Sequence, residues 1–383
     1  MVSGKCKAYL EAHRGEMLAL LEELVMIDSG SYFKAGVDRV AAVLEKAYRD
    51  AGFETRVMEH EDCGNGLVVT RPGGGVRVLL IGHLDTVFLE GAAAANPFRI
   101  SDGIAYGPGV LDQKSCLVGA LYAIKALLAV CSGELPTVTV VMSGDEEIGS
   151  FHMRELFESQ ARGSDWGIVI EPAREHGEIV IERKGGGGLT VRATGRAAHA
   201  GIEPRHGRNA IEELALKIPK LKALNDFEAG ITVTIGQISG GEARNVVARY
   251  AEMAVDLRFS TPQHGEALFE AIRKILAEPE IEGVTLDYDL TLYRQPLTQV
   301  PGVEKLHRTV KEAGDELGIE YKTAKTGGLS DGNFTAAVGL PTVDGLGPVG
   351  GLMCSPDEYL EVDSMVPRAA RLAAVLHKLQ NAK

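Results

Sequence analysis

The feature that most constrains the fold is a series of apolar, β-like runs that each end shortly before a potential metal ligand. These runs and the polar residues that follow them are 76–81 with His83, 138–142 with Glu146 and Glu147, and 167–170 with Glu171. In an α/β sheet, side chains on the loops after separate parallel strands meet at the carboxyl edge, where such folds build their sites. The ordered series therefore predicts one shared site rather than scattered polar loops.

The first half of the chain alternates between helical and strand-like patterns. An amphipathic helix is expected over residues 6–24, a second helix over 36–51, and an almost wholly apolar helix over 116–130. Helices that alternate with strands are typical of a mostly parallel sheet flanked by helices on both faces. We therefore expect an α/β fold.

The pattern changes near residue 183. Four consecutive glycines at 185–188 indicate a hinge or a tight chain crossing. A β-α-β-β-α-β series follows, which is the order of a ferredoxin-like sandwich. We therefore expect a catalytic domain made of residues 1–183 and 295–383, with an inserted α+β domain over residues 184–294 that serves as a lid and a dimerisation surface.

Charge and cysteine content restrict the cellular context. The 383 residues carry a formal net charge of −13, which argues against a general nucleic-acid binder. The five cysteines include no Cys-x-x-Cys and are far apart, as in a reduced cytoplasmic protein. No signal peptide and no membrane span are expected, because apolar runs stay short of about 18 residues.

Each polar group also has a simpler interpretation when it is taken alone. His83 with Asp85 is a metal ligand with its orienting carboxylate, or else an ordinary loop histidine beside a capping aspartate. Asp112 follows the turn 107–109 and could bridge two metals, or it is a carboxylate at a helix start. A phosphate-binding loop fits this turn less well, since the third spaced glycine is missing and Asp112 would repel a pyrophosphate.

The adjacent pair Glu146 and Glu147 is more informative than the other groups. Two neighbouring carboxylates after a buried strand repel each other unless a cation lies between or near them. One of them can then bind metal while the other accepts a proton from the attacking water. Alone, the pair is equally consistent with a solvated acidic turn. Together with Glu171, Asp112 and His83, it favours a two-metal hydrolase.

Several motifs resemble the dinuclear zinc family of glutamate carboxypeptidases, aminoacylases and succinyl-diaminopimelate desuccinylases, and the resemblance is strongest to the glutamate carboxypeptidase branch. The stretches that carry it cover nearly the whole chain: Gly-His-Leu-Asp-Thr-Val at 82–87, Gly-Pro-Gly at 107–109 with Asp112, Gly-Asp-Glu-Glu-Ile-Gly at 144–149, Glu-Pro at 171–172, Gly-Arg-Ala-Ala-His-Ala-Gly at 195–201, and Ser-Pro-Asp-Glu-Tyr at 355–359.

The resemblance implies a role for each matching residue of the centre. It places His83, Asp112 and Glu171 on one zinc, and Asp112 with Glu147 on a second. Glu146 would be the general base and later the acid, with Asp85 behind His83. The implied cofactors are two Zn²⁺ per subunit, and Co²⁺ or Mn²⁺ are metals that the same site could take.

The inserted domain carries further residues that match the family. His199 would stabilise the tetrahedral oxyanion from the partner subunit of a homodimer. Asn245 and Arg258 match positions that grip the substrate, and a bidentate pair between Arg258 and the substrate carboxylate would suit a guanidinium. Gly328 lies in a segment that resembles the family's glycine-rich substrate loop.

One position departs from the family, which has a histidine ligand immediately before Ser-Pro-Asp-Glu-Tyr. Here Cys354 takes that place. A thiolate binds zinc well, but a cysteine could equally line the loop and leave the second site weak. We expect a metal-dependent hydrolase of an amide bond next to a free carboxylate, acting on an N-acyl amino acid or short peptide. The alternatives are a deacylase of N-acetyl, N-succinyl or N-carbamoyl compounds, and a metal-binding relative impaired by Cys354.

Overall fold

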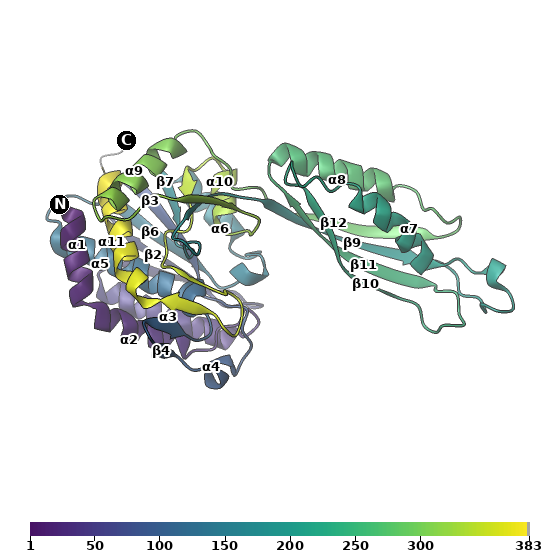
Figure 1. Ribbon diagram of the computed structural model, residues 1–383, viewed down its shortest axis with the longest axis horizontal. Helices are drawn as coiled ribbons and strands as arrows, with labels where there is room; N and C mark the ends of the chain where they lie inside the picture. The colour runs from purple at the N-terminus through teal and green to yellow at the C-terminus, as the bar shows by residue number, and fades with distance from the viewer. Residues whose placement is uncertain (381–383) are drawn as a thin grey trace. The chain divides into compact units, whose positions relative to one another are not determined.

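The computed structural model describes residues 1–380 and divides into two compact units (Figure 1). Unit 1 contains residues 1–182 and 298–326 and continues from residue 330. Unit 2 contains residues 183–297 together with 327–329.

A six-stranded sheet forms the centre of unit 1. Its strands, in spatial order, are β1 (Glu54–Met58), β2 (Gly66–Arg71), β6 (Pro136–Ser143), β3 (Gly74–His83), β7 (Trp166–Val169) and β14 (Thr342–Val343). The pairings from β6 through β3 and β7 to β14 are parallel, whereas β1–β2 and β2–β6 are antiparallel. The predicted α/β class is confirmed, and three of the five pairings are parallel, so the sheet is a mixed one in which parallel pairing predominates.

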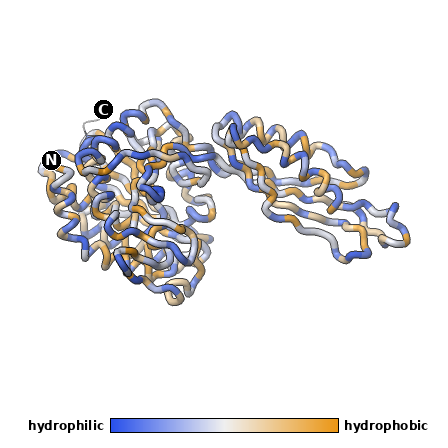
Figure 2. The backbone as a smooth tube through the Cα atoms, viewed as in Figure 1, coloured by the Kyte–Doolittle hydropathy of each residue, from blue (hydrophilic) through white to orange (hydrophobic). Residues whose placement is uncertain are grey.

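Helices cover both faces of this sheet. Neighbouring side chains of β3 point to opposite faces, so Leu80 joins one core while Leu79 and Ile81 join the other. Figure 2 shows the apolar segments concentrated inside the unit. The helices of the larger core are α1 (Val2–Ala12), α2 (Arg14–Val25), α3 (Lys34–Asp50), α5 (Cys116–Val130), α9 (Val303–Asp315) and α11 (Val362–Leu379); those of the smaller core are α6 (Arg154–Arg162) and α10 (Gly332–Ala337).

Two sequence predictions about helices can be compared with the structure. The single helix expected over 6–24 is broken at His13, whose ring Nδ1 lies 2.7 Å from the Tyr9 carbonyl oxygen, at the point where the backbone leaves helical geometry.

By length and composition alone, the stretch Val110–Val130 could cross a membrane, yet 78% of it is buried. A helix that is apolar on all sides and buried in this way is a core helix.

Smaller elements complete unit 1. They are α4 (Ala92–Ala95), the antiparallel sheet of β15 (Gly350–Gly351), β16 (Tyr359–Glu361), β5 (Ile104–Tyr106) and β4 (Arg99–Ser101), and the two-stranded sheet of β13 (Thr323–Thr326) and β8 (Ile179–Arg183). Within this group, the turn between β15 and β16 carries Cys354.

Unit 2 is a four-stranded antiparallel sheet packed against two helices. The elements follow the order β9 (Gly185–Thr194), α7 (Ala210–Lys222), β10 (Thr232–Gly240), β11 (Tyr250–Phe259), α8 (Pro262–Leu276) and β12 (Thr285–Arg294). In space the strands run β10-β11-β9-β12. This is the β-α-β-β-α-β arrangement of a ferredoxin-like sandwich.

The four glycines at 185–188, where a hinge or a tight chain crossing was expected, form the first part of β9. They are paired in register with β11 and β12. A side chain at Gly187 would lie 2.6 Å from the Thr291 carbonyl oxygen, and one at Gly188 would lie 1.9 Å from the Tyr293 hydroxyl. The glycines therefore make room for the neighbouring strand and the side chains above it.

Candidate metal centre

The predicted ligands of unit 1 converge at one edge of the six-stranded sheet. His83 is the last residue of β3, Glu146 and Glu147 lie in the turn after β6, and Glu171 follows β7. Because β6, β3 and β7 are parallel neighbours, these three loops leave the sheet at the same edge. His83, Asp112 and Glu147 each place one ligand atom within 4.8 Å of the others.

His83 lies at the middle of the group and is only 2% exposed. Its Nε2 is 3.2 Å from Asp112 Oδ1 and 3.5 Å from Glu171 Oε1. Its Nδ1 lies 3.0 Å from the Asp85 carbonyl oxygen and 3.4 Å from Asp85 Oδ1. Because Nδ1–H donates to the Asp85 carbonyl oxygen, Nε2 is the nitrogen that could bind a metal. This is the usual arrangement of a metal-binding histidine.

Asp85 also fixes the turn that carries the two glutamates. Its buried carboxylate accepts the backbone N–H of Glu146 at 3.0 Å and that of Glu147 at 3.1 Å. The Ser31 hydroxyl donates a third hydrogen bond, at 2.7 Å. One carboxylate thus orients the histidine and positions the turn beside it.

Two residues for which no role was predicted hold the predicted ligands in place. The Gln113 side chain accepts the His83 backbone N–H at 3.0 Å and donates to Glu171 Oε1 at 2.5 Å. The buried Glu358 carboxylate accepts the backbone N–H of Leu111 at 2.8 Å, of Asp112 at 3.0 Å, and of Cys354 at 3.2 Å. In the sequence, the only feature that pointed to Gln113 was its position next to Asp112. Glu358 lies in the Ser-Pro-Asp-Glu-Tyr motif that matches the family, but no role was predicted for it.

Cys354 lies beside two of the predicted ligands, Asp112 and Glu147. Its Sγ is 3.8 Å from Asp112 Oδ2 and 4.0 Å from Glu147 Oε1. The residue has φ 62°, a left-handed conformation that is uncommon outside glycine. The Glu358 carboxylate holds the backbone N–H of Cys354 in this turn. The loop therefore presents the sulfur to the two carboxylates.

The charges of the group favour a cation. Burial raises the pKa of Glu147 to about 9, and the neighbouring Asp112 carboxylate adds to that rise. Burial lowers the pKa of His83, but hydrogen bonds with Asp112, Asp85 and Glu171 outweigh it and raise this pKa well above its ordinary value. Negative charge that is buried and clustered in this way favours a bound cation. Imidazole and carboxylate are zinc ligands, so the residues fit a zinc-type centre.

A pocket of about 570 Å³ adjoins Glu147. Most of its wall is apolar or aromatic, and its only charged side chains are carboxylates. The lining residues are Gly30, Ser31, Tyr32, Phe33, Thr86, Val87, Phe88, Leu89, Glu90, Glu147 and Ile148.

The remaining predicted residues belong to unit 2. His199 is exposed, and the Ala200 backbone N–H donates to the Asn245 carbonyl oxygen at 2.9 Å, so the segments of His199 and Asn245 run side by side. Arg258 makes a bidentate pair with Asp256, through two contacts of 2.9 Å. The Gly328 carbonyl oxygen lies 3.4 Å from Arg183 Nη1.

Comparison with known proteins identifies the group to which this arrangement belongs. The profile of Peptidase family M20/M25/M40 matches residues 79–378. This chain belongs to that family. The M20/M25/M40 match includes all the predicted metal ligands, from His83 to Cys354. The chain is therefore a metal-dependent peptidase or amidohydrolase.

Individual relatives in the M20 family match this chain over most of its length. The chain is 28% identical over 369 residues to carboxypeptidase G2 of Pseudomonas sp. (strain RS-16), covering 94% of this chain and 88% of that protein. It is 29% identical over 332 residues to succinyl-diaminopimelate desuccinylase of Azoarcus sp. (strain BH72), covering 81% and 85%. The crystal structure of aminopeptidase PepT from Bacillus cereus ATCC 10987 superposes with a TM-score of 0.76 at 24% identity, covering 97% and 99%.

Proposed function

We propose that this chain hydrolyses an amide bond next to a free carboxylate, in an N-acyl amino acid or a short peptide. The observation that carries the proposal is the position of Glu146. It lies in the same turn as the ligand Glu147, at the sheet edge where His83, Asp112 and Glu171 meet. The name carboxypeptidase G2 of one relative agrees with this substrate class.

We propose that His83, Asp112 and Glu171 hold one Zn²⁺ and that Asp112, Glu147 and Cys354 hold a second, with Co²⁺ or Mn²⁺ as possible replacements. When bound, such a metal would polarise the amide carbonyl and lower the pKa of the attacking water. Glu146 takes the proton of that water and passes it to the leaving amine. Asp85 keeps Glu146 in place through the backbone hydrogen bond at 3.0 Å.

The pocket beside Glu147 favours an apolar group on the substrate. Tyr32, Phe33 and Leu89 supply much of its surface, and its charged side chains are the carboxylates Glu90 and Glu147. A succinyl carboxylate placed there would face like charges without a cationic partner. We therefore propose that apolar or aromatic acyl groups are preferred over succinyl groups.

We propose that unit 2 binds the substrate carboxylate and forms a homodimer. Asp256 occupies the Nε and Nη2 edge of Arg258, which leaves the Nη1 edge for the substrate. His199 would stabilise the oxyanion from the partner subunit, beside Asn245 and with Gly328 on the substrate loop.

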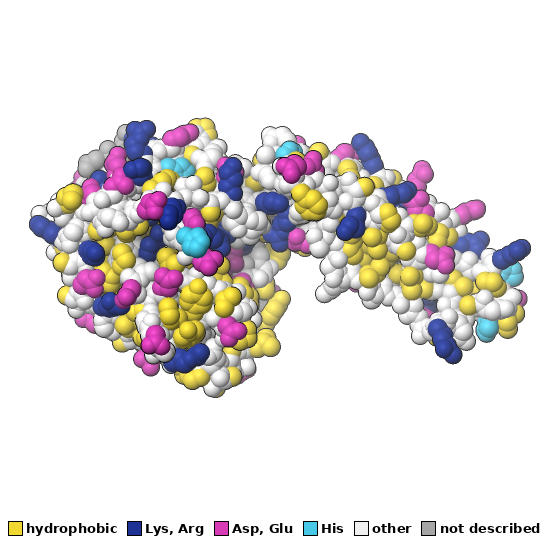
Figure 3. Space-filling model, in the orientation of Figure 1, with side chains coloured by type: hydrophobic (Ala, Val, Ile, Leu, Met, Phe, Trp, Pro, Cys, Tyr) yellow, Lys and Arg dark blue, Asp and Glu magenta, His cyan; other side chains and the backbone are white. Residues whose placement is uncertain are grey.

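The surface of unit 2 supports the dimer. Strand β10 is at the end of its sheet, its residues 236–240 are exposed, and Ile238 is 51% exposed. Figure 3 shows hydrophobic side chains on the visible face of this unit. An edge strand with exposed apolar side chains is a ready pairing surface. Sedimentation as a monomer at micromolar concentration would contradict the dimer and the role of His199 in the partner's site.

The test of the activity combines metal analysis with a substrate panel. Purified protein loaded with zinc is assayed on N-acyl glutamates with benzoyl, acetyl, carbamoyl and succinyl groups. We expect the benzoyl compound to be cleaved fastest. Faster cleavage of the succinyl compound would mark a desuccinylase instead. Background rates on the whole panel, with zinc bound, would contradict the hydrolase proposal.

We also propose a cytoplasmic location, in accord with the unpaired cysteines.

A further inference from the structure

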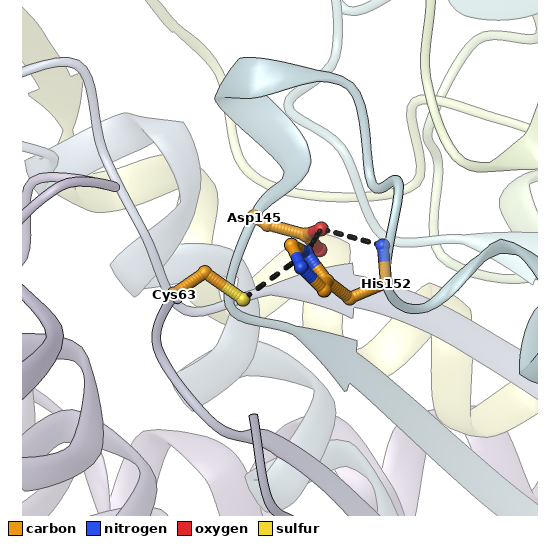
Figure 4. A group of neighbouring side chains, drawn as sticks. All are labelled: Cys63, Asp145 and His152. Atoms are coloured by element: carbon orange, nitrogen blue, oxygen red, sulfur yellow. Dashed lines mark hydrogen bonds and ion pairs between the residues drawn. The ribbon is translucent and has the colours of Figure 1, made fainter. Parts of the chain in front are cut away.

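A second cluster of metal-ligand side chains lies outside the ligand set of the proposed dinuclear centre (Figure 4). Cys63 comes from the loop between β1 and β2, Asp145 follows β6, and His152 lies just before α6. His152 Nδ1 is 3.3 Å from Cys63 Sγ and 3.0 Å from Asp145 Oδ2. One ligand atom from each residue lies within 4.8 Å of the others.

The geometry differs from that of a catalytic Cys-His-Asp triad. In such a triad one ring nitrogen faces the nucleophile while the other faces the carboxylate. Here the thiol and the carboxylate both approach the same nitrogen, His152 Nδ1. Cys63 is also only 2% exposed, and reactive cysteines lie in accessible positions. The three groups surround a common point, as metal ligands do.

Asp145 provides an independent observation. It is fully buried, and its Oδ1 accepts no hydrogen bond from any residue in the described part of the chain. Its Oδ2 accepts the backbone N–H of His152 at 3.0 Å in addition to the ring contact. A buried carboxylate oxygen without a partner is costly, by roughly 1–3 kcal/mol or more. A cation bound by both oxygens of the Asp145 carboxylate would give Oδ1 a partner and remove that cost.

The cluster is also open to a metal ion. The His152 side chain is 36% exposed, so an ion can enter from solvent on that side. The ring of His60 lies 5.2 Å from the ring of His152, centroid to centroid, and offers an additional imidazole beside the cluster. Thiolate, imidazole and carboxylate together are a donor set that zinc prefers over magnesium or calcium.

We propose that Cys63, Asp145 and His152 bind one Zn²⁺ as a site separate from the dinuclear centre, with water or His60 as the fourth ligand. On binding, the Cys63 thiol releases its proton to solvent as the sulfur–metal bond forms. His152 binds through Nδ1 as neutral imidazole. No electron is transferred.

The position of this site links it to the turn of the general base. Asp145 directly precedes Glu146, and its carbonyl oxygen accepts the Ser150 backbone N–H at 2.7 Å. A zinc ion on Asp145 therefore restrains the segment that carries Glu146 and Glu147. This zinc has a structural role and touches no reacting atom.

The test measures bound zinc, with Zn²⁺ alone as the probe. Reduced full-length protein is dialysed against buffered Zn²⁺, and metal content is measured by elemental analysis for wild type, Cys63→Ser and His152→Ala. We expect each variant to bind about one Zn²⁺ fewer per chain than wild type. Cys131→Ser is the matched control, because Cys131 Sγ lies 3.9 Å from His377 Nδ1 in a Cys-His pair elsewhere in unit 1. It should keep the wild-type content.

Cobalt gives a second readout that does not depend on activity. The thiolate-to-cobalt band of the Co²⁺-loaded protein should weaken in Cys63→Ser, and the part that remains should disappear when Cys354→Ser is added. Should Cys63→Ser not fold, the exposed His152→Ala substitution decides alone. Equal zinc content in wild type and in these variants overturns the proposal, and a loss in only one of two folded variants overturns the three-ligand site.

Discussion

Asp85 Oδ1 lies 3.0 Å from the backbone nitrogen of Glu146 and accepts its N–H, although the two residues are 61 positions apart. This bond joins the loop after β3 to the turn after β6. The same carboxylate faces the ring of His83. In the proposed centre, the affinity for metal and the position of the proposed base Glu146 would therefore both depend on the Asp85 side chain.

Asp85→Asn should weaken zinc binding by about 10–100-fold, because an outer partner of a metal ligand orients that ligand. An asparagine presents an NH₂ group toward one of the two backbone N–H donors now held by the carboxylate. Competition with a zinc chelator measures the affinity. Asp50→Asn, on an exposed helix end, is the control and should bind as wild type. Equal affinities in all three proteins would remove Asp85 from the support of the centre.

Glu146→Gln should retain metal and lower turnover by about 10²–10⁴-fold, which is the usual range for general acid–base catalysis. The amide matches the carboxylate in shape but does not accept the proton of the attacking water. Steady-state kinetics with zinc-loaded protein measure the loss. Glu155→Gln on α6 is the matched surface control. Near wild-type turnover in Glu146→Gln would exclude this residue as the base.

Substitutions of Cys354 distinguish two hypotheses about the proposed second metal. Either the Cys354 thiolate is one of its ligands, or the cysteine only lines the loop. If its thiolate is a ligand, Cys354→Ala should lose about one Zn²⁺ per chain, since the sulfur now lies 3.8 Å from Asp112 and 4.0 Å from Glu147. Cys354→His replaces an anion by a neutral ligand, so the bound metal becomes a stronger Lewis acid. The pH profile of turnover should then move to lower pH. Unchanged zinc content and affinity in Cys354→Ala would show that the thiolate is not a ligand.

The site was predictable where ligands follow strands directly. His83, Glu147 and Glu171 each follow a buried run, and parallel strands bring such positions to one edge. Glu358 was not assigned a role, because it supports Asp112 from 246 residues away and no local pattern reports that contact. The Cys63 cluster was also missed, since Cys63 lies 89 positions before His152 and no local pattern joins them.

The antiparallel pairing of β1 with β2 could have been predicted from the sequence. Only residues 59–65 connect β1 to β2, whereas a parallel crossover needs a dozen or more residues. The two strands therefore had to form an antiparallel hairpin. For the glycines of β9, the sequence did not decide between a hinge and a tight chain crossing. Their role is to admit Thr291 and Tyr293 from the neighbouring strand, and that role depends on pairing between distant residues.

Unit 2 contains a buried ion network whose removal should be costly. Lys217 is 1% exposed and donates to the carbonyl oxygens of Ile275 at 2.8 Å and Glu278 at 2.6 Å, and to Glu280 Oε1 at 2.7 Å. The buried Glu213 lies 3.8 Å from the same ammonium group. Lys217→Met removes the donor to the two carbonyl oxygens and the cation nearest the buried Glu213 carboxylate, which then keeps only its backbone N–H donors from Glu280 and Ile281. We expect a loss of about 3–5 kcal/mol.

Lys220→Met is the matched control for this prediction. Lys220 is on the same helix and contacts the same Glu280 oxygen, at 2.6 Å, but its side chain is 50% exposed. An exposed pair of this kind contributes about 0–1 kcal/mol. Hydrogen exchange of the amides of α7 and β9 measures the stability of unit 2 itself. Equal protection in the two variants would contradict a stabilising role for the buried ammonium group.

Glu280 should make the stability of unit 2 depend on acid pH. Hydrogen bonds from Lys217 and Lys220 lower the pKa of Glu280 from its ordinary 4.5 to about 2. The unfolded chain therefore takes up this proton at a higher pH than the folded chain does. The resulting stabilisation is complete above pH 4.5 and is lost as the pH falls toward 2. Glu280→Gln should flatten that part of the stability–pH curve of unit 2, measured by hydrogen exchange. Glu278→Gln, an exposed neighbour, should keep the wild-type slope, and equal slopes in all three proteins would show that Glu280 does not couple protonation to folding.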